Sequence, residues 1–329
     1  MNLRIIKAGV MDTIQDLGRY GWQHMGINPG GAMDKLSAQI ANILVGNETT
    51  EAVVELHFPA SAFFFEQPSL IAITGADFSA TINGECIPSM RPVLVSKYSI
   101  LQFHKVVNGS RAYLAVHGGL GTEPWLNSAS THLKAEAGGH KGRVLQKDDE
   151  IAFRKAADLC SLLEKKEFEV LPWKADNDWA NNHLEEIWAL PGHEWNWLSD
   201  SSRQKFFEES FVITNHSDRM GYHLRGEPFC TTTKEEMISS AVSFGTVQLL
   251  PDGQLIVLMA DHQTTGGYPR LAHVISVHHS RLAQMKPGDQ FCFRFTDQST
   301  AEELYIKQQQ HLLQLQNASK FKLEQLLDG

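Results

Sequence analysis

The sequence lacks several features that mark large functional classes. It contains no run of Lys and Arg: its 29 basic residues are scattered and are outnumbered by 38 acidic ones, for a formal net charge of −9. Nucleic acids and anionic membranes bind proteins through a clustered positive face, so neither is expected as a partner. A small anion could still bind wherever single arginines converge.

Cysteine is scarce, and long apolar runs are missing. The cysteines are widely separated and form no Cys-x-x-Cys pair, so neither a zinc site nor a disulfide framework is predicted: Cys86, Cys160, Cys230 and Cys292. No apolar run approaches the length of a membrane span, and the N-terminus reaches Asp12 too soon to supply a signal peptide. We therefore expect a cytoplasmic protein with reduced thiols and no bound metal.

Several catalytic and binding motifs are also missing from the sequence. It has no Gly-x-x-x-x-Gly-Lys-Ser/Thr loop for phosphates, no Gly-x-Gly-x-x-Gly after a strand, no His-Glu-x-x-His and no Gly-x-Ser-x-Gly. The segment Gln284-Met285-Lys286 resembles half of a biotin-acceptor sequence, but Pro287 follows it. Nucleotide or biotin would therefore have to reach this chain through another subunit.

What the sequence does contain predicts a mainly β protein of two domains. Its 329 residues are 42% hydrophobic, and short β-like runs separated by turn signals fill residues 52–153 and recur from 211 to 295. Asn83-Gly84 predicts a tight hairpin. Helices are predicted at 34–44 and 203–209.

The expected division is an N-terminal β subdomain at 1–165, a connector at 166–200 holding five of the seven Trp, a C-terminal β subdomain at 201–298, and an amphipathic helix at 299–329 that begins with a capping box at Thr300–Glu303.

The segment 260–270 is the strongest candidate for a site. A buried strand, 255–259, is predicted to lead directly into polar and glycine residues: Asp261, His262, Gln263, Thr264, Thr265, Gly266, Gly267 and Tyr268. Polar side chains at the end of a rigid strand are a common way to build a site, and glycines let a ligand approach the backbone. A solvated hairpin turn is the alternative interpretation.

Three more segments place a carboxylate beside glycine: Gln15-Asp16-x-Gly18-Arg19, Thr74-Gly75-Ala76-Asp77 and Ser217-Asp218-Arg219-Met220-Gly221. An Arg near an Asp is most often a structural ion pair. The same arrangement also binds a carboxylate, carbamate or phosphate, so convergence of Arg19 and Arg219 would make an anion site. Asp34 is a further candidate acid, although it could instead cap the helix that follows it.

These segments closely resemble motifs of the biotin-dependent carboxyltransferase family. Three further segments share the resemblance: Gly31-Ala32-Met33-Asp34, Ala41-Asn42-x-Leu44-Val45-Gly46-Asn47 and Gln263-Thr264-Thr265-Gly266-Gly267-Tyr268-Pro269. That family includes allophanate hydrolase subunit 2, KipA-type proteins and a 5-oxoprolinase subunit. The resemblance implies two cyclophilin-like β-barrel subdomains with a site between them, and a companion subunit of related fold.

The resemblance also implies three alternative functions. The first is ATP-dependent opening of 5-oxoproline to L-glutamate together with 5-oxoprolinase subunits A and B, with ATP reaching the site through a partner and no covalently bound cofactor. The second is carboxyl transfer to urea or a similar amide from biotin that another protein carries in trans. The third is sequestration of a regulatory partner, as KipA-type proteins are thought to do.

Under the first function, Arg19 and Arg219 would hold anionic groups. The candidates for proton transfer are Asp34, Asp77, Asp218 and Asp261. The substrate carbonyl would be oriented by the segment from Gln263 and Thr264 through Thr265, Gly266 and Gly267 to Tyr268. The sequence departs from the family at Leu190-Pro191-Gly192-His193-Glu194, where members usually carry Gly-Pro-Gln, so its substrate could differ.

Overall fold

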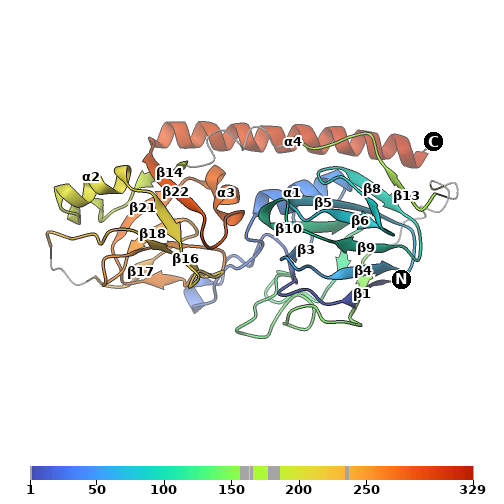
Figure 1. The fold of residues 1–329 in the computed structure, drawn as a ribbon, viewed down its shortest axis with the longest axis horizontal. Helices are drawn as coiled ribbons and strands as arrows, with labels where there is room; N and C mark the ends of the chain where they lie inside the picture. The colour runs from blue at the N-terminus through green and yellow to red at the C-terminus, as the bar shows by residue number, and fades with distance from the viewer. Residues whose placement is uncertain (1, 156–162, 164–165, 177–185, 234–236, 329) are drawn as a thin grey trace. The chain divides into compact units, whose positions relative to one another are not determined.

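The chain folds into two compact units (Figure 1). The computed structural model describes residues 2–155, 163, 166–176, 186–233 and 237–328; Cys160 and Trp179 lie outside these ranges. The first unit contains residues 1–19, 30–176 and 310–329, and the second contains 20–29 and 177–309.

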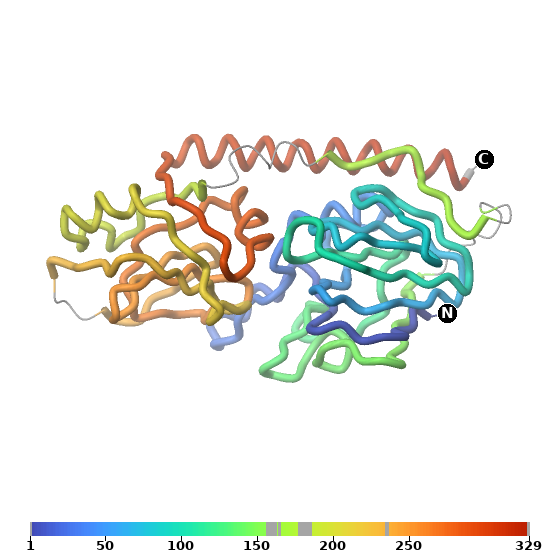
Figure 2. The backbone as a smooth tube through the Cα atoms, in the orientation of Figure 1, coloured from blue at the N-terminus to red at the C-terminus, as the bar shows by residue number. Residues whose placement is uncertain are grey.

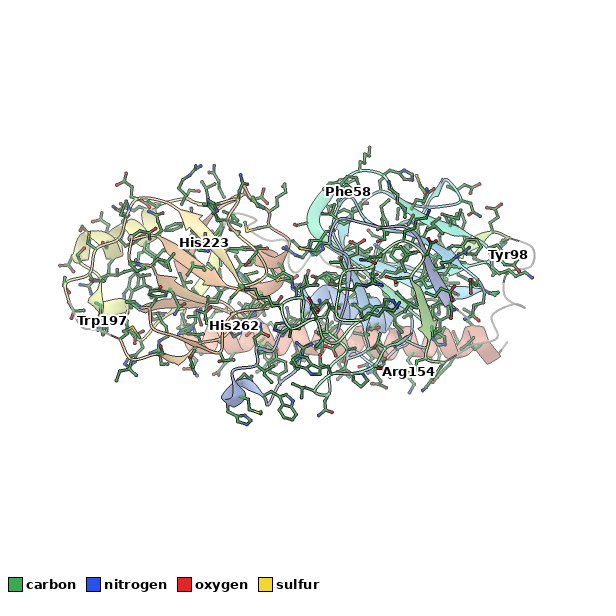
Figure 3. The ribbon with its side chains drawn as sticks, turned by 90° about the horizontal axis from the view of Figure 1, so that it is seen from below. Phe58, Tyr98, Arg154, Trp197, His223 and His262 are labelled. Carbon is green, nitrogen blue, oxygen red and sulfur yellow. The ribbon has the colours of Figure 1, made fainter. Side chains whose placement is uncertain are left out.

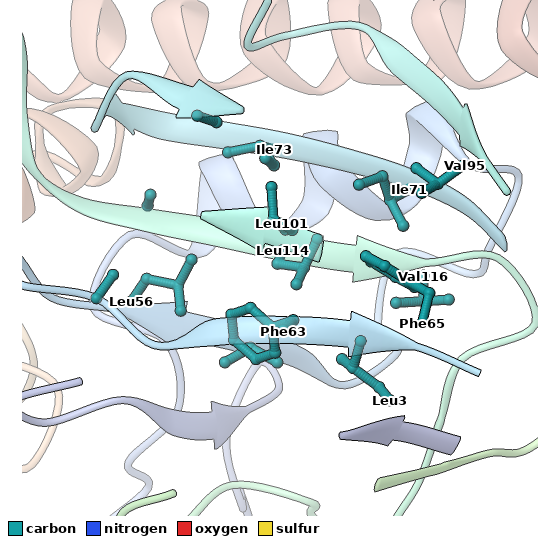
Figure 4. Close-up of a cluster of buried hydrophobic side chains, with 14 of the residues drawn as sticks. Leu3, Leu56, Phe63, Phe65, Ile71, Ile73, Val95, Leu101, Leu114 and Val116 are labelled. Carbon is teal, nitrogen blue, oxygen red and sulfur yellow. The ribbon is translucent and has the colours of Figure 1, made fainter. Parts of the chain in front are cut away.

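Two antiparallel sheets form the first unit. One has the strand order β11 (Leu120–Gly121), β12 (Glu150–Phe153), β1 (Asn2–Lys7), β4 (Ala62–Phe65), β9 (Ile100–Phe103), β6 (Ala80–Ile82) and β7 (Glu85–Cys86). The other has the order β13 (Phe168–Val170), β8 (Pro92–Val95), β5 (Ser69–Asp77), β10 (Asn108–Val116), β3 (Val53–Leu56) and β2 (Thr13–Gln15). Both sheets contribute side chains to one apolar core, in which Leu3 and Phe63 of the first sheet and Ile71 and Leu114 of the second are fully buried (Figure 4).

Local sequence signals account for several elements of this unit. Strands β6 and β7 are joined by Asn83 and Gly84, whose φ angles of 49° and 90° are the positive values that a tight hairpin turn requires. Helix α1 (Lys35–Leu44) begins at Asp34, as predicted, and packs on β5 and β10. Its buried residues, which include Ile40 and Leu44, cover the outer face of the second sheet.

The second unit is a closed barrel. Its strand order is β14 (Glu186–Pro191), β21 (Arg270–Val274), β18 (Thr246–Leu249), β19 (Leu255–Leu258), β16 (Gly221–Arg225), β15 (Phe211–Ile213) and β22 (Gln290–Phe295), with β14 and β22 parallel. A separate pair joins β17 (Ser240–Ala241) to β20 (Thr265–Gly266). The described part of this unit also contains helices α2 (Asp200–Glu208) and α3 (His279–Ala283) and the 3₁₀ turns Gln23–Met25, Trp195–Trp197 and Ser276–His278. The prediction of a mainly β protein is confirmed.

The segment 166–200 contains strands of both units. Within the proposed connector 166–200, residues 168–170 form β13 of the first unit and 186–191 form β14 of the barrel. Trp195 packs into an aromatic cluster, with ring centroids 5.1 Å from Phe206 and 4.7 Å from Phe295. Trp195 is thus part of the aromatic cluster of the second unit, whereas Trp173 belongs to the first unit, where its Nε1 donates to the Leu44 carbonyl at 3.3 Å. Residues 20–29, assigned by sequence to the first domain, belong to the second unit (Figure 2).

The C-terminal helix begins one residue before the predicted range 299–329. Helix α4 covers Gln298–Asp328, and its first turn is capped by Asp297, which accepts a hydrogen bond from the Thr300 N–H at 2.8 Å. The residue that caps the helix therefore lies three residues before the predicted one, Thr300, because Asp297 accepts the hydrogen bond of the first turn. Leu323 is buried against Gly46, where an added Cβ would lie 2.3 Å from its Cδ2. No helix in the described ranges combines the length and apolar composition that a membrane span needs.

Candidate functional site

The candidate residues fall in both units. Arg19, Asp34 and Asp77 belong to the first unit, and Asp218, Arg219, Asp261 and the segment 263–268 belong to the second. Whether Arg19 and Arg219 converge thus stays a prediction, and each unit is considered by itself.

Asp34 is fully buried at the start of α1. Its Oδ1 accepts from the Ser37 N–H at 3.0 Å and its Oδ2 from the Ser37 hydroxyl at 2.6 Å. The Asp34 N–H donates to the Tyr113 hydroxyl at 2.8 Å, and that hydroxyl donates to Glu55 Oε2 at 2.9 Å. Burial, followed by the charges of Glu55 and Asp34, raises the pKa of Tyr113 well above its usual value, so it remains a donor. Both carboxylate oxygens of Asp34 thus support the helix start.

Asp77 is the last residue of β5 and is half-buried. Its Oδ1 accepts from the Ser79 N–H at 2.8 Å, while its own N–H donates to Asn108 Oδ1 at 3.1 Å. These bonds shape the turn into β6, where Ser79 has a φ of 55°. The geometry of Asp77 is that of a turn-stabilising aspartate.

The Asp16 and Arg19 side chains hold the loop around Ser128 against the N-terminal segment. Asp16 Oδ1 accepts from the hydroxyls of Ser128 at 2.7 Å and Ser130 at 2.5 Å. Arg19 is 1% exposed; its Nη2 donates to the Ser130 carbonyl, and its guanidinium lies 4.7 Å from the ring centroid of Trp125. In this unit, Arg19 therefore has an evident structural role.

Arg219 and Asp261 come together on the second unit. Arg219 Nε donates to Asp261 Oδ2 at 2.8 Å and Nη2 donates to Oδ1 at 3.2 Å. The pairing of β16 with β19 explains the approach: Gly221 lies opposite Leu258, and beyond the ladder the Asp261 N–H donates to the Arg219 carbonyl at 2.8 Å. Antiparallel neighbours bring the start of one strand to the end of the other, so two distant motifs meet.

The turn before β16 is shaped by Asp218 and Gly221. Asp218 lies outside the buried core, and its Oδ1 accepts from the Met220 N–H at 2.7 Å. A Cβ on Gly221 would lie 2.6 Å from Ile256 Cδ1, so glycine allows β16 to approach β19 closely. Asp218 thus organises the turn that presents Arg219.

The segment after Asp261 is an edge strand with an exposed side. His262 is 4% exposed, with its Nδ1 2.6 Å from the Gln263 carbonyl (Figure 3). Thr265 and Gly266 pair with β17, and the Thr264 carbonyl accepts from the Val242 N–H at 3.3 Å. The exposed residues are Thr265, Gly267 and Tyr268. The segment is therefore ordered by strand pairing and still accessible.

Sequence reasoning missed Asn28. Its Nδ2 donates to the Asp261 carbonyl at 2.9 Å, which places a residue from the N-terminal part of the chain beside the Arg219–Asp261 pair. The sequence carries no signal for this contact, because residues 20–29 join the second unit only through the tertiary fold.

The second unit therefore gathers groups suited to a small polar ligand. The guanidinium of Arg219 and the carboxylate of Asp261 lie next to the ends of strands β16 and β19. The side-chain amide of Asn28 lies beside them, and accessible main-chain groups follow Asp261 in the sequence. A guanidinium is a group that binds carboxylates and phosphates, and that of Arg219 is oriented by the bonds of its Nε and Nη2 to Asp261. The neighbouring carboxylate is a group that can transfer a proton.

Comparisons with known proteins agree with this fold. The family described as carboxyltransferase domain, subdomain A and B, matches residues 25–295. The C subunits of 5-oxoprolinase from Escherichia coli and Haemophilus influenzae are each 34% identical to this chain, over 94% and 92% of it and over 95% and 94% of their own lengths. The urea amidolyase of Saccharomyces cerevisiae is 29% identical over 88% of this chain and 16% of its own length.

The fold is also found in a much larger solved protein. The urea amidolyase of K. lactis matches 95% of this chain with a TM-score of 0.85 at 24% sequence identity. This chain covers 20% of that protein, so the likeness concerns the fold of one part of it.

Proposed function

Because the chain belongs to the family of carboxyltransferase domains with subdomains A and B, we propose that it is a non-autonomous subunit of an ATP-dependent 5-oxoprolinase. Such a complex opens the cyclic amide of 5-oxoproline to L-glutamate while ATP is hydrolysed. The proposal rests on the 34% identity with the 5-oxoprolinase C subunits of E. coli and H. influenzae, which extends over more than nine-tenths of this chain. The proposed setting is the cytoplasm.

The groups of the second unit support this chemistry. An amide carbonyl is a weak electrophile, so its opening at neutral pH needs activation or strong polarisation. Arg219, oriented by Asp261, would bind the carboxylate of the substrate, and Asp261 would be placed for proton transfer. The accessible main chain from Thr265 to Gly267 would orient the carbonyl. The proposed partners are 5-oxoprolinase subunits A and B, and ATP would bind through them.

Carboxyl transfer is the second candidate function, and the similarity to urea amidolyase favours it. Biotin would then be carried by another protein. The segment that partly resembles a biotin acceptor departs from that pattern, because Pro287 follows Lys286. The same Arg219–Asp261 pair would serve this function by binding a small amide.

Turnover by a reconstituted complex tests the proposal. The chain alone, the candidate A and B subunits alone, and the complete mixture would each receive 5-oxoproline and ATP, with glutamate and ADP measured. Formation of both products only in the complete mixture is expected. A verified complex that produces neither would remove the proposal, and carboxybiotin with urea-like acceptors would then be tested.

Variants of the pair separate a catalytic from a purely binding role. We expect Asp261→Asn to lower kcat/KM by roughly 100-fold, the usual contribution of one proton-transfer group. Arg203→Ala is the matched control, since Arg203 lies in the same unit and pairs with the exposed Asp200. A regulatory protein that only sequesters a partner would keep its function when Arg219 and Asp261 are both changed to Ala.

A further inference from the structure

The chain segment after β14 lies along the start of β21. The Gly192 N–H donates to the Leu271 carbonyl at 2.8 Å, and the Glu194 N–H donates to the Arg270 carbonyl at 3.2 Å. A Cβ on Gly192 would lie only 2.1 Å from the Arg270 carbonyl oxygen, so this approach requires glycine. The stretch 190–194, where the sequence departs from the family pattern, is thus built against Arg270.

The Glu194 carboxylate is occupied by Arg270. Its Oε2 accepts from the main-chain N–H and from Nε of Arg270, both at 2.9 Å, and its Oε1 accepts from Nη2 at 2.8 Å. Glu194 is 3% exposed. Burial raises the pKa of this carboxyl, but the hydrogen bonds and charge of Arg270 outweigh burial and hold the pKa below its usual range. Glu194 therefore stays charged and bound to Arg270.

Arg270 ends the segment that carries the candidate binding residues. That segment is also anchored on β18, where Gln248 Nε2 donates to the Tyr268 carbonyl at 3.3 Å and the Leu249 N–H donates to the Pro269 carbonyl at 2.9 Å. Gly266 lies so close to Gln248 that an added Cβ would be 2.6 Å from Nε2. The exposed residues of the segment are thus followed directly by its anchors on β18 and on Glu194.

We propose that Glu194 is a positioning residue for the segment Thr265–Tyr268, acting through Arg270. The inference rests on the proposed function, because it assumes that this segment meets the substrate. By binding both the main chain and the side chain of Arg270, Glu194 sets the geometry in which Gly267 and Tyr268 face a ligand. A displacement of about 1 Å in such an element can cost on the order of 100-fold in rate.

Two measurements on Glu194→Gln test this inference. In the reconstituted complex, we expect the KM for 5-oxoproline to rise about tenfold, with a smaller change in kcat, because loss of the charge loosens the binding segment. In the isolated chain, we expect amide hydrogen exchange at 265–268 to become about tenfold faster while exchange at 255–258 stays the same. Arg270→Lys removes the same planar contact and should reproduce both effects.

Glu186→Gln is the matched control, because Glu186 lies on β14, the strand that precedes Glu194, and pairs with Arg294 at 3.3 Å. Equal effects in Glu194→Gln and Glu186→Gln, or unchanged KM and exchange in Glu194→Gln, would overturn the positioning role. If the wild-type complex shows no turnover, the proposed function fails by itself. Hydrogen exchange then decides the positioning role: faster exchange at 265–268 supports it, and unchanged exchange at these residues contradicts it.

Discussion

Arg219 and Asp261, 42 residues apart in the sequence, form a bidentate ion pair with nitrogen–oxygen distances of 2.8 and 3.2 Å. The pair is mostly buried: the Arg219 side chain is 8% exposed and that of Asp261 is 21% exposed. Both ends belong to motifs that the sequence selects independently, so this contact joins two candidate segments of the second unit.

Breaking this pair should cost stability as well as activity. We expect Asp261→Ala to lower the free energy of unfolding by about 2 kcal/mol, because a mostly buried guanidinium loses its charged acceptor. Urea unfolding of Asp261→Ala, Arg219→Ala and the double variant forms a double-mutant cycle. Additive losses would show that the two side chains are not energetically coupled.

The close approach of β16 to β19 predicts a steric effect at Gly221. Gly221→Ala should destabilise the chain by about 1–3 kcal/mol, since its Cβ would meet Ile256 Cδ1 at 2.6 Å. Ile256→Val removes that methyl group and should recover part of the loss. Thermal unfolding of the single and double variants measures both changes; a double variant as unstable as the sum of the singles would contradict the steric explanation.

The burial of Asp12 indicates that the first unit becomes more stable on mild acidification. Burial raises the pKa of Asp12 from 3.8 to about 6, although N–H donors at His57 and Ser61 oppose the rise. The folded state therefore prefers protonated Asp12. Its contribution is fully present below pH 3.8 and is lost as pH rises to about 6, a change of about 3 kcal/mol.

Hydrogen exchange of β1 and β3 at pH 4.5 and pH 7 measures this change. The comparison is made against Asp12→Asn, in which the contribution of residue 12 should no longer depend on pH. A wild type and a variant with identical pH dependence would show that Asp12 does not titrate in this range.

The burial of His278 indicates that the stability of the second unit responds to pH in the opposite direction. Its Nδ1 accepts from the Trp188 N–H at 2.9 Å, which requires that nitrogen to be unprotonated. Burial and then the charge of Arg281 lower the pKa of His278 from 6.5 to about 4. Stability is therefore present above pH 6.5 and is lost by about 3 kcal/mol as pH falls through 4.

Exchange in β14 and β21 follows this loss between pH 6.5 and pH 4. His278→Gln retains a side-chain acceptor without a titrating group, so its barrel should show a weaker pH dependence. Equal acid sensitivity in the wild type and His278→Gln would assign the effect to another group.

Sequence alone determined the elements whose signals are local. Short apolar runs bounded by turn residues specify most strands of the first unit, because several of these strands are buried on both faces. Asn83-Gly84 specifies its hairpin and Asp34 specifies the start of α1, since each depends on a few neighbouring residues. The family resemblance rested on contiguous motifs of the same local kind.

Tertiary structure alone decided how distant segments combine. Asn28 joins the second unit, Glu194 binds Arg270 and Arg219 meets Asp261, and no local pattern encodes these partners because each contact depends on strand order in the barrel. Burial also separated candidates that looked alike in sequence. Arg19 and Asp34 form hydrogen bonds inside the first unit, whereas Thr265, Gly267 and Tyr268 remain accessible, because exposure depends on the packing of the whole unit.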